Sequence, residues 1–385
     1  MTKPADRPGQ PGFTRGTADM AQHWPQHWIG LADRTTALFH TGGLTASTPE
    51  RPGPADLLAR GTLMLETGVP CHSRPQMLLS YHHLHPWERG LALHALPDGS
   101  VVLVVTQGGS VVHSVLHHGL TGQGHTLCVS YVWDAPARTG HLSVKSLDTG
   151  RMYLQPVANP LPLSLGDLQA IFQHPSAADM DRQVAFAALS DSIQPIGPMP
   201  SLAPDVPILT EQGYRPIRQI RSGDLVRTSA GDLVPVLANL RHSLPARGSF
   251  RPIRLRAPYF GLQRDITVAP SQRLCVSGSD VEFLFGSPAV QLPARHLVNG
   301  VSAWYVDCPP VVTWHQLLLS QAQAVLAAGA PMQSLYLGRM RRKPDQIAAS
   351  LLAGMDRTRL PEHARPPFPV LRAIEAATLL QHRAA

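Results

Sequence analysis

Hydrophobic and polar positions alternate in short runs over residues 61–160, and turn-forming residues separate one run from the next. Every second position at 127, 129, 131 and 133 is apolar or aromatic, which is the period of a strand with one buried face. Many such runs, with turn signals about every 8–12 residues, are typical of a β-sandwich or barrel. They predict strands at residues 62–67, 76–81, 90–95, 101–107, 111–116, 126–133 and 140–147.

A second pattern of short strands and tight turns occupies residues 208–236. Its turns, at Gln212-Gly213, Ser222-Gly223-Asp224 and Ala230-Gly231-Asp232, lie close together between β-branched residues. Turns with this spacing specify an all-β unit of short strands. The two patterns together predict a mainly β protein, with an N-terminal jelly-roll-like sandwich, a C-terminal all-β domain and few short helices.

Helical and linker signals are few. Residues 163–172 carry apolar positions at helical spacing after Ser164, a candidate N-cap, and residues 178–191 are predicted as a second short helix. Residues 370–380 are predicted as a closing helix. Four prolines within residues 192–204 predict a linker between the two β units.

The N-terminal 55 residues have the composition of a flexible tail. They are rich in Pro, Gly and polar residues but contain Trp24 and Trp28. Two tryptophans in such a segment either anchor a partner or pack against the body of the protein, and we favour packing.

The composition of the 385-residue chain limits its classes of function. A hydrophobic share of 43% is enough for packed cores, and the length allows two domains. The net charge of +7 comes from basic residues that are spread along the chain, apart from one cluster at Arg339, Arg341, Arg342 and Lys343. Binding to nucleic acid or to an anionic membrane is therefore disfavoured.

Targeting signals are absent from the sequence patterns. The first 30 residues lack the apolar core of a Sec-type signal peptide, and no apolar run approaches the ~18 residues of a membrane span. We therefore expect a soluble protein, either cytoplasmic or exported by a non-Sec route.

Cysteine and histidine residues give no metal-site spacing. Cys128 and Cys275 lie in apolar runs, which predicts buried free thiols. Cys71 and Cys308 are also isolated, and the spacing of the four cysteines does not decide whether any of them form disulfides. The first β unit is rich in histidine, including His82, His83, His85, His113, His117, His118 and His125. No Cys, Asp or Glu stands at a ligand spacing beside them, so we predict surface histidines and no metal or cofactor.

Five blocks follow one another in the second half of the chain. They are ILTEQGYRPIRQIRSGDLVRTSAGDLVPV, FRPIRLRAPYFG with RDITVAPSQRLCVSG, QLPARHLVNGVS, VVTWHQLLLSQAQAVLAAGAPMQSLYLG and PVLRAIEAATLL. In this order they resemble the Hint (hedgehog/intein) family of bacterial type, whose members cut or rearrange their own backbone. The resemblance implies a compact all-β Hint domain with an autoprocessing site.

The first β unit has a more diffuse likeness. ALPDGSVVLVVTQGG precedes TLCVSYVWDAPARTGHLSVKSLDTG, and this order of elements is similar to the concanavalin/laminin-G-like jelly roll. Folds of that class often present carbohydrate or protein ligands, so the resemblance implies a carbohydrate or protein partner.

The predicted organisation combines these observations. It consists of a flexible tail at 1–55, a laminin-G-like sandwich at 56–160, short helices with a Pro-rich linker at 161–200, a Hint domain at 201–340, and a basic tail with a closing helix at 341–385.

The Hint resemblance implies a nucleophile, usually Cys and sometimes Ser, at the first residue of the domain, and a His that protonates the departing amide nitrogen. Matching the blocks puts Ser201 at the nucleophile position and Gln272 at the position of that His. An amide side chain cannot change its protonation state near neutral pH. The carbonyl to be attacked belongs to the rigid Pro200. The family's second His falls at about Ala322, which leaves His315, and a core role is favoured for that residue.

These departures predict a protein with a degenerate autoprocessing site, acting as a non-catalytic binding or structural module. The alternative is a protein that cuts itself between Pro200 and Ser201. A third hypothesis is a carbohydrate-active enzyme, for which Glu66, Glu88 and Asp98 are the only well-placed carboxylates.

Overall fold

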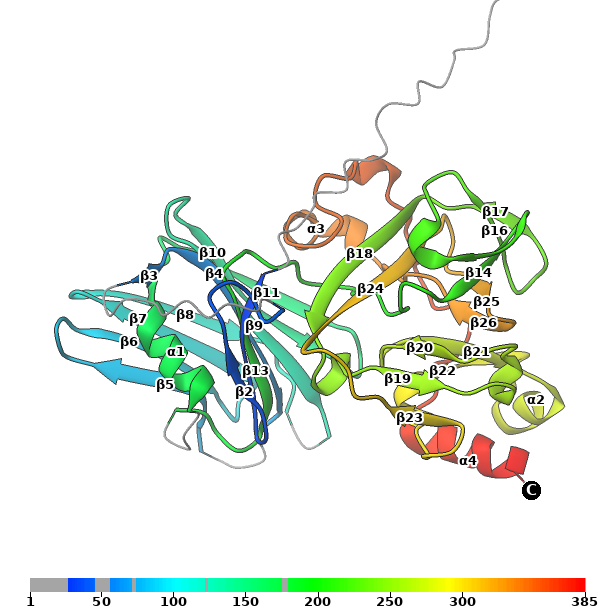
Figure 1. Ribbon diagram of the computed structural model, residues 1–385, viewed down its shortest axis with the longest axis horizontal. Helices are drawn as coiled ribbons and strands as arrows, with labels where there is room; N and C mark the ends of the chain where they lie inside the picture. The colour runs from blue at the N-terminus through cyan, green and yellow to red at the C-terminus, as the bar shows by residue number, and fades with distance from the viewer. Residues whose placement is uncertain (1–26, 46–55, 71–73, 122–123, 175–178, 385) are drawn as a thin grey trace, which may run out of the picture.

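The computed structural model describes residues 27–45, 56–70, 74–121, 124–174 and 179–384. These residues form a mainly β protein, as the alternation of the sequence predicts. An N-terminal sandwich and a C-terminal β part lie side by side, at the left and right of Figure 1. The described residues contain four short α-helices.

The N-terminal sandwich consists of two antiparallel sheets. The larger sheet has seven strands in the order β11 (Met152–Ala158), β10 (Thr139–Ser146), β9 (Thr126–Asp134), β4 (Arg60–Gly68), β13 (Val184–Ser190), β1 (Trp28–Asp33) and β2 (Ala37–Phe39). The smaller sheet has the order β5 (Gln76–His83), β6 (Arg89–Ala95), β7 (Ser100–Gln107) and β8 (Ser110–His117). A short pair, β3 (Leu57–Leu58) and β12 (Leu163–Ser164), precedes helix α1 (Leu165–Gln173).

All seven strands predicted from the alternation are present, as β4 to β10. Leu127, Val129, Tyr131 and Trp133 are fully buried on one face of β9, as their period of two requires. The predicted N-cap is also confirmed, because the Ser164 side chain accepts a hydrogen bond from the Asp167 amide at 3.3 Å.

Two predictions about β13 and β1, the strands that follow β4 in the sheet order, are wrong. Residues 28–33 are not part of a flexible tail but form β1, and residues 184–190 are not helical but form β13. Both strands are buried on both faces, so their sequences read as continuous apolar runs without alternation. Ala187 and Leu189 of β13 face the core of the sandwich, whereas Phe186 and Ala188 face the C-terminal part. Trp24 lies outside the described residues.

The Pro-rich segment between the two parts is packed and not an open linker. The Gln194 amide donates to Thr62 Oγ1 at 2.8 Å, and the Ile196 amide donates to the Ala349 carbonyl at 2.8 Å. Ser201 at its end is only 5% exposed. The described segments after residue 341 are likewise packed, since Ile347, Leu352 and other apolar residues there are buried.

The C-terminal β part contains three sheets. The largest has the order β17 (Leu233–Pro235), β16 (Leu225–Arg227), β14 (Pro207–Thr210), β25 (Ala324–Ala327), β26 (Ala330–Gln333), β21 (Arg273–Ser277) and β22 (Ala289–Pro293), with β15 (Gly213–Pro216) paired to β14. The others pair β18 (Ala238–Pro245) with β24 (Val311–Leu318), and β20 (Ile266–Val268), β19 (Ile253–Leu255) and β23 (Ala303–Tyr305). The helices are α2 (Ser279–Phe285), α3 (Pro344–Ala348) and α4 (Ala373–Ala384). Helix α4, the predicted closing helix, packs Ala376 and Leu379 on this core.

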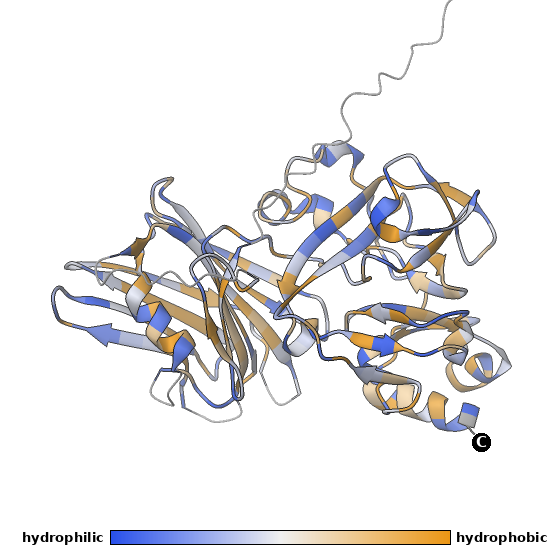
Figure 2. Cartoon of the chain, viewed as in Figure 1, coloured by the Kyte–Doolittle hydropathy of each residue, from blue (hydrophilic) through white to orange (hydrophobic). Residues whose placement is uncertain are grey.

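The outer face of the seven-stranded sheet packs against the C-terminal part. One hydrophobic cluster spans the contact, with Trp28, Leu31, Met64, Cys128, Phe186 and Ala188 from the sheet and Leu244, Phe250, Ala269 and Trp314 opposite. The Trp28 indole donates to the Ser243 carbonyl at 2.9 Å, and Arg247 Nε donates to Asp33 Oδ2 at 2.7 Å. Figure 2 shows that the strands in the middle of the molecule are largely hydrophobic, consistent with a sheet covered on both faces.

Three cysteines are described, and all are free. Cys128 is buried, and burial raises the pKa of its thiol to about 12, so it behaves as an apolar core residue. Cys275 and Cys308 are partly buried, and Cys71 lies outside the described residues. Of the helices in the described part of the chain, none combines the length and the apolar character that crossing a bilayer needs.

Burial of His242 predicts that stability falls in mild acid. Its ring is fully buried, and neither ring nitrogen has a hydrogen-bond partner among the described residues. Burial lowers the pKa of His242 to about 3, below its value of about 6.5 in an unfolded chain. The folded state therefore keeps the ring neutral. The contribution of this neutral ring to the free energy of unfolding is complete above pH ~6.5 and is lost as the pH falls toward about 3.

We expect the free energy of unfolding to fall by about 1.4 kcal/mol per pH unit for this one group below pH ~6. His242→Met should remove that contribution, as measured by urea unfolding at several pH values between about 4 and 7. An identical pH slope in the variant and the wild-type protein would contradict this role of His242.

Candidate functional site

Ser201 is held where the Pro-rich segment enters the C-terminal part. Its amide donates to the His315 carbonyl at 3.3 Å, and its carbonyl accepts from the Ala269 amide at 2.8 Å. The next residue, Leu202, bridges both Val268 and His315 in a strand-like arrangement. The backbone of Ser201 is thus fixed between β20 and β24.

The hydroxyl of Ser201 lies among glutamine side chains. Its Oγ is 2.6 Å from Gln272 Oε1 and 3.2 Å from Gln316 Oε1. Gln272 Nε2 donates to the carbonyls of Arg273 and Gln333, at 3.0 and 3.1 Å, and Gln316 Nε2 donates to the Gln333 carbonyl at 2.8 Å. These donations orient both amide oxygens toward the hydroxyl, so Ser201 acts as the donor.

A second layer of the same network lies behind these residues. Gln291 Nε2 donates to Gln333 Oε1 at 2.6 Å, and Gln291 Oε1 accepts from Arg273 at 3.2 Å. We refer to Gln272, Gln291, Gln316 and Gln333 as the glutamine network; each of the four is at most 3% exposed. Because the amide groups of these four side chains are hydrogen-bonded, burying them costs little free energy, and the network holds Ser201 rigidly.

The structure brings only two of the three sequence-predicted residues together through their side chains. Gln272 contacts the Ser201 hydroxyl, whereas the side chain of His315 points away, with its Nδ1 3.4 Å from Asn239 Oδ1. Adjacent residues of a strand face opposite sides, so Gln316 points to Ser201 and His315 does not. Burial lowers the pKa of His315 to about 4, with the neighbouring Arg241 contributing, so its ring is neutral at pH 7.

Three residues of this network, Gln316, Gln291 and Gln333, are not predicted from the sequence. The signal for Gln316 was present, since it follows His315 in a strand whose alternation allows only one of the two to face the site. Gln291 and Gln333 come from β22 and β26, and no local pattern connects these strands to Ser201.

No titratable acid or base reaches the Ser201 hydroxyl within the described residues. The partners of its Oγ are the two amide oxygens, and the cavity beside it is lined by no His, Cys, Asp or Glu. Attack by a hydroxyl requires a base to take its proton, and departure of the amide nitrogen requires an acid. Among the described residues, the Ser201 hydroxyl is therefore positioned by two amide oxygens and has no base in hydrogen-bond contact.

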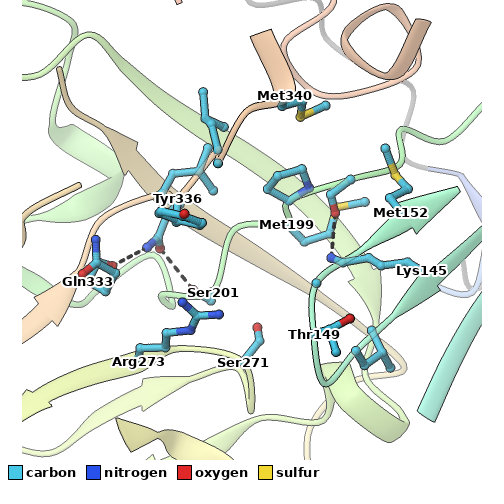
Figure 3. A pocket seen from close by; sticks show the side chains of 18 of the residues that line it. Lys145, Thr149, Met152, Met199, Ser201, Ser271, Arg273, Gln333, Tyr336 and Met340 are labelled. Carbon is cyan, nitrogen blue, oxygen red and sulfur yellow. Dashed lines mark hydrogen bonds between the residues drawn. The ribbon is translucent and has the colours of Figure 1, made fainter. Parts of the chain in front are cut away.

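A cavity of about 360 Å³ opens beside this network (Figure 3). One wall comes from the β10–β11 hairpin of the sandwich, including Lys145, Thr149 and Met152. The others come from the Pro-rich segment, β21, β26 and the residues that follow β26. We call this space the interdomain cavity, because both parts of the molecule form it.

The carboxylates considered for a glycosidase have separate partners. Glu66 accepts from the Ser249 amide at 2.9 Å in the contact between the two parts. Glu88 pairs with His82 at 3.5 Å, and Asp98 accepts from the Ser100 amide at 2.9 Å. Across the ranges the structure describes, no group of three or more His, Cys, Asp or Glu residues is arranged to hold a metal ion.

Comparison with known proteins assigns the part of the chain that contains Ser201. Residues 200–339 match the family model of the Hint domain. The Hint domain thus includes the glutamine network, in agreement with the resemblance of the sequence blocks. No curated protein matches the chain.

Solved structures with low similarity cover each half. The MchDnaB-1 intein (N145AA) is 16% identical over 34% of this chain and 98% of its own, with a TM-score of 0.26. A bacterial intein-like domain from Clostridium thermocellum is 13% identical over 35% of this chain and 99% of its own, with a TM-score of 0.24. The Ruminococcus gnavus IT-sialidase CBM40 bound to α2,3-sialyllactose is 14% identical over 36% of this chain and 78% of its own, with a TM-score of 0.28. Such low scores carry no functional information.

Proposed function

We propose that this protein keeps its backbone intact and uses its Hint domain as a non-catalytic module that is docked on the N-terminal sandwich. The observation that carries the proposal is the environment of Ser201, whose hydroxyl donates to amide oxygens and meets no base. Each missing general acid or base lowers a rate by about 10²–10⁴. A serine hydroxyl also ionises far less readily than the thiol that the family usually employs.

The contact between the sandwich and the Hint domain supports the structural side of this proposal. Large buried side chains such as Trp28 and Trp314 lie in one cluster that both parts share, so separation would expose a wide apolar surface. A protein built to release its N-terminal part would gain nothing from such an interface. The unit proposed to meet the Hint domain (201–340) is larger than the predicted 56–160, because β1 and β13 supply Trp28, Leu31, Phe186 and Ala188 to this contact.

Intact-mass spectrometry of the purified chain tests the proposal. We expect one species of 41.7 kDa, unchanged by incubation with a thiol or with hydroxylamine, because no ester forms at Ser201. Ser201→Ala should give the same result. Fragments that break between Pro200 and Ser201 in the wild-type chain, and that disappear in Ser201→Ala, would establish the self-cleaving alternative instead.

A further inference from the structure

The interdomain cavity is strongly basic. Six basic residues line it, namely Lys145, Arg151, Arg273, Arg295, Arg339 and Lys343, and no Asp or Glu of the described chain does so. These residues are far apart in sequence and come from both parts of the molecule. Of these six, Arg295 alone forms an ion pair with a carboxylate of the described residues, at 3.8 Å from Asp148, which does not line the cavity.

Arg273 is the best-placed of these cations. Its guanidinium is partly buried and donates to Gln291 Oε1 at 3.2 Å, and it has no ion-pair partner in the part of the chain described. Burial and the neighbouring Arg295 lower its pKa. A guanidinium removed from water without a counter-charge is costly, and an anion in the cavity would offset that cost.

Lys145 reaches the same space from the sandwich side. Its ammonium donates to the Gly197 carbonyl at 2.8 Å, a neutral acceptor that leaves the charge uncompensated. Burial lowers the pKa of Lys145, and the charge of Arg273 adds to this effect. The two basic groups therefore lie on one cavity, from opposite parts of the molecule, and an anion there would favour the protonated form of Lys145.

The cavity also has hydroxyl and apolar groups at different places. Figure 3 shows Arg273, Ser271 and Tyr336 on one side and the methionines Met152, Met199 and Met340 on another. Flexible thioether side chains adapt to apolar groups of varied shape. Arg273 thus lies on a polar side of the lining, and Lys145 lies on the other side, beside Met152 and Met199.

We infer that the interdomain cavity binds a small organic anion, with a carboxylate or phosphate head at Arg273 and Lys145 and an apolar body against the methionines. The volume of about 360 Å³ suits a small molecule and is too small for a macromolecule. Guanidinium groups bind both carboxylate and phosphate oxygens in pairs, so the two heads share one chemistry. The inference goes beyond the proposed function. The binding site requires the two parts to be docked, but it does not depend on whether Ser201 reacts.

Calorimetric titration of the full chain with four probes tests this inference. Octanoate and octyl phosphate carry a charged head and an apolar body, octanamide lacks the charge, and inorganic phosphate lacks the body. We expect one site for octanoate, octyl phosphate or both, and binding at least about tenfold weaker for octanamide and inorganic phosphate. No binding of either amphiphilic anion, or equal binding of the uncharged amide, would overturn the inference.

Variants locate the site. Arg273→Gln should weaken binding of the amphiphilic anion by at least about tenfold, and Arg264→Gln, an exposed arginine that does not line the cavity, should not change it. Arg339→Gln at the exposed rim should cost about threefold and serves if Arg273→Gln fails to fold. Affinities unchanged in both cavity variants would exclude this site. Mass spectra of the same samples show separately whether the backbone is intact, so failure of one proposal is distinguishable from failure of the other.

Discussion

Ser201→Cys combined with Gln272→His is expected to give a chain that breaks before residue 201, seen as two fragments after hydroxylamine treatment. The Ser201 hydroxyl lies 2.6 Å from the Gln272 side chain, so a group at position 272 reaches the nucleophile. A thiol ionises several pH units below an alcohol, and an imidazole can take and return a proton near pH 7. Together these groups should raise the cleavage rate by at least about 10²-fold over the wild-type chain, measured by intact mass over time.

The matched control is Ser201→Cys combined with Gln291→His. Gln291 belongs to the same glutamine network and is fully buried, but it bonds to Gln333 and not to Ser201. This control and Ser201→Cys alone should stay largely intact. Equal fragment yields from the two double variants would contradict the idea that cleavage is absent because position 272 carries no titratable group.

Gly248→Ala should destabilise the protein, at the contact between the two parts, more than Gly→Ala at a glycine where an added Cβ meets no other atom. Gly248 begins the short 3₁₀ turn η2 (Gly248–Phe250) with φ of +51°, and a Cβ there would lie 2.6 Å from Glu66 Oε2. Glu66 is a buried carboxylate whose pKa is raised by burial, and the Ser249 amide holds it at 2.9 Å. Strain at the backbone and loss of this hydrogen bond should lower the free energy of unfolding by about 3 kcal/mol.

Gly108→Ala separates the steric effect from the backbone effect. Gly108 has a similar φ of +56°, but a Cβ there would meet nothing within 4 Å. Only the strain of a left-handed conformation applies, and the expected loss is about 1 kcal/mol. Urea unfolding of both variants measures the difference. Equal losses would show that the approach of Gly248 to Glu66 does not matter for stability.

Strand prediction from the sequence succeeded where alternation or flanking turn residues mark the strand locally. In β9 every residue after Thr126 is buried, but the small Cys128 and Ser130 alternate with Leu127, Val129 and Tyr131, so the period of two stays visible in the sequence. In β1 and β13 the second face meets the Hint domain, so polar positions are missing and the period disappears. The packing of one part on the other therefore hid these strands from a local pattern.

The candidate site was partly accessible to sequence reasoning. Matching the Hint blocks selected Ser201 and Gln272, and the two side chains lie in contact. The same matching selected His315, whose side chain faces away, because a block match gives the strand but not which face a residue occupies. The roles of these residues in catalysis remain a prediction.

From its local periodicity and turn residues alone, the chain specified most of its strands and a capped helix, and the resemblance to the Hint blocks predicted that position 272 carries an amide in place of a histidine. Such features depend on neighbours a few residues apart. Tertiary packing decided that Gln316 completes the surroundings of Ser201, and that Lys145 and Arg273 share one cavity. Both pairs are separated by more than a hundred residues. Ser201 and Gln316 meet because residues 201 and 202 pair with His315 inside the Hint domain, whereas Lys145 and Arg273 meet because the sandwich buries its second face on that domain.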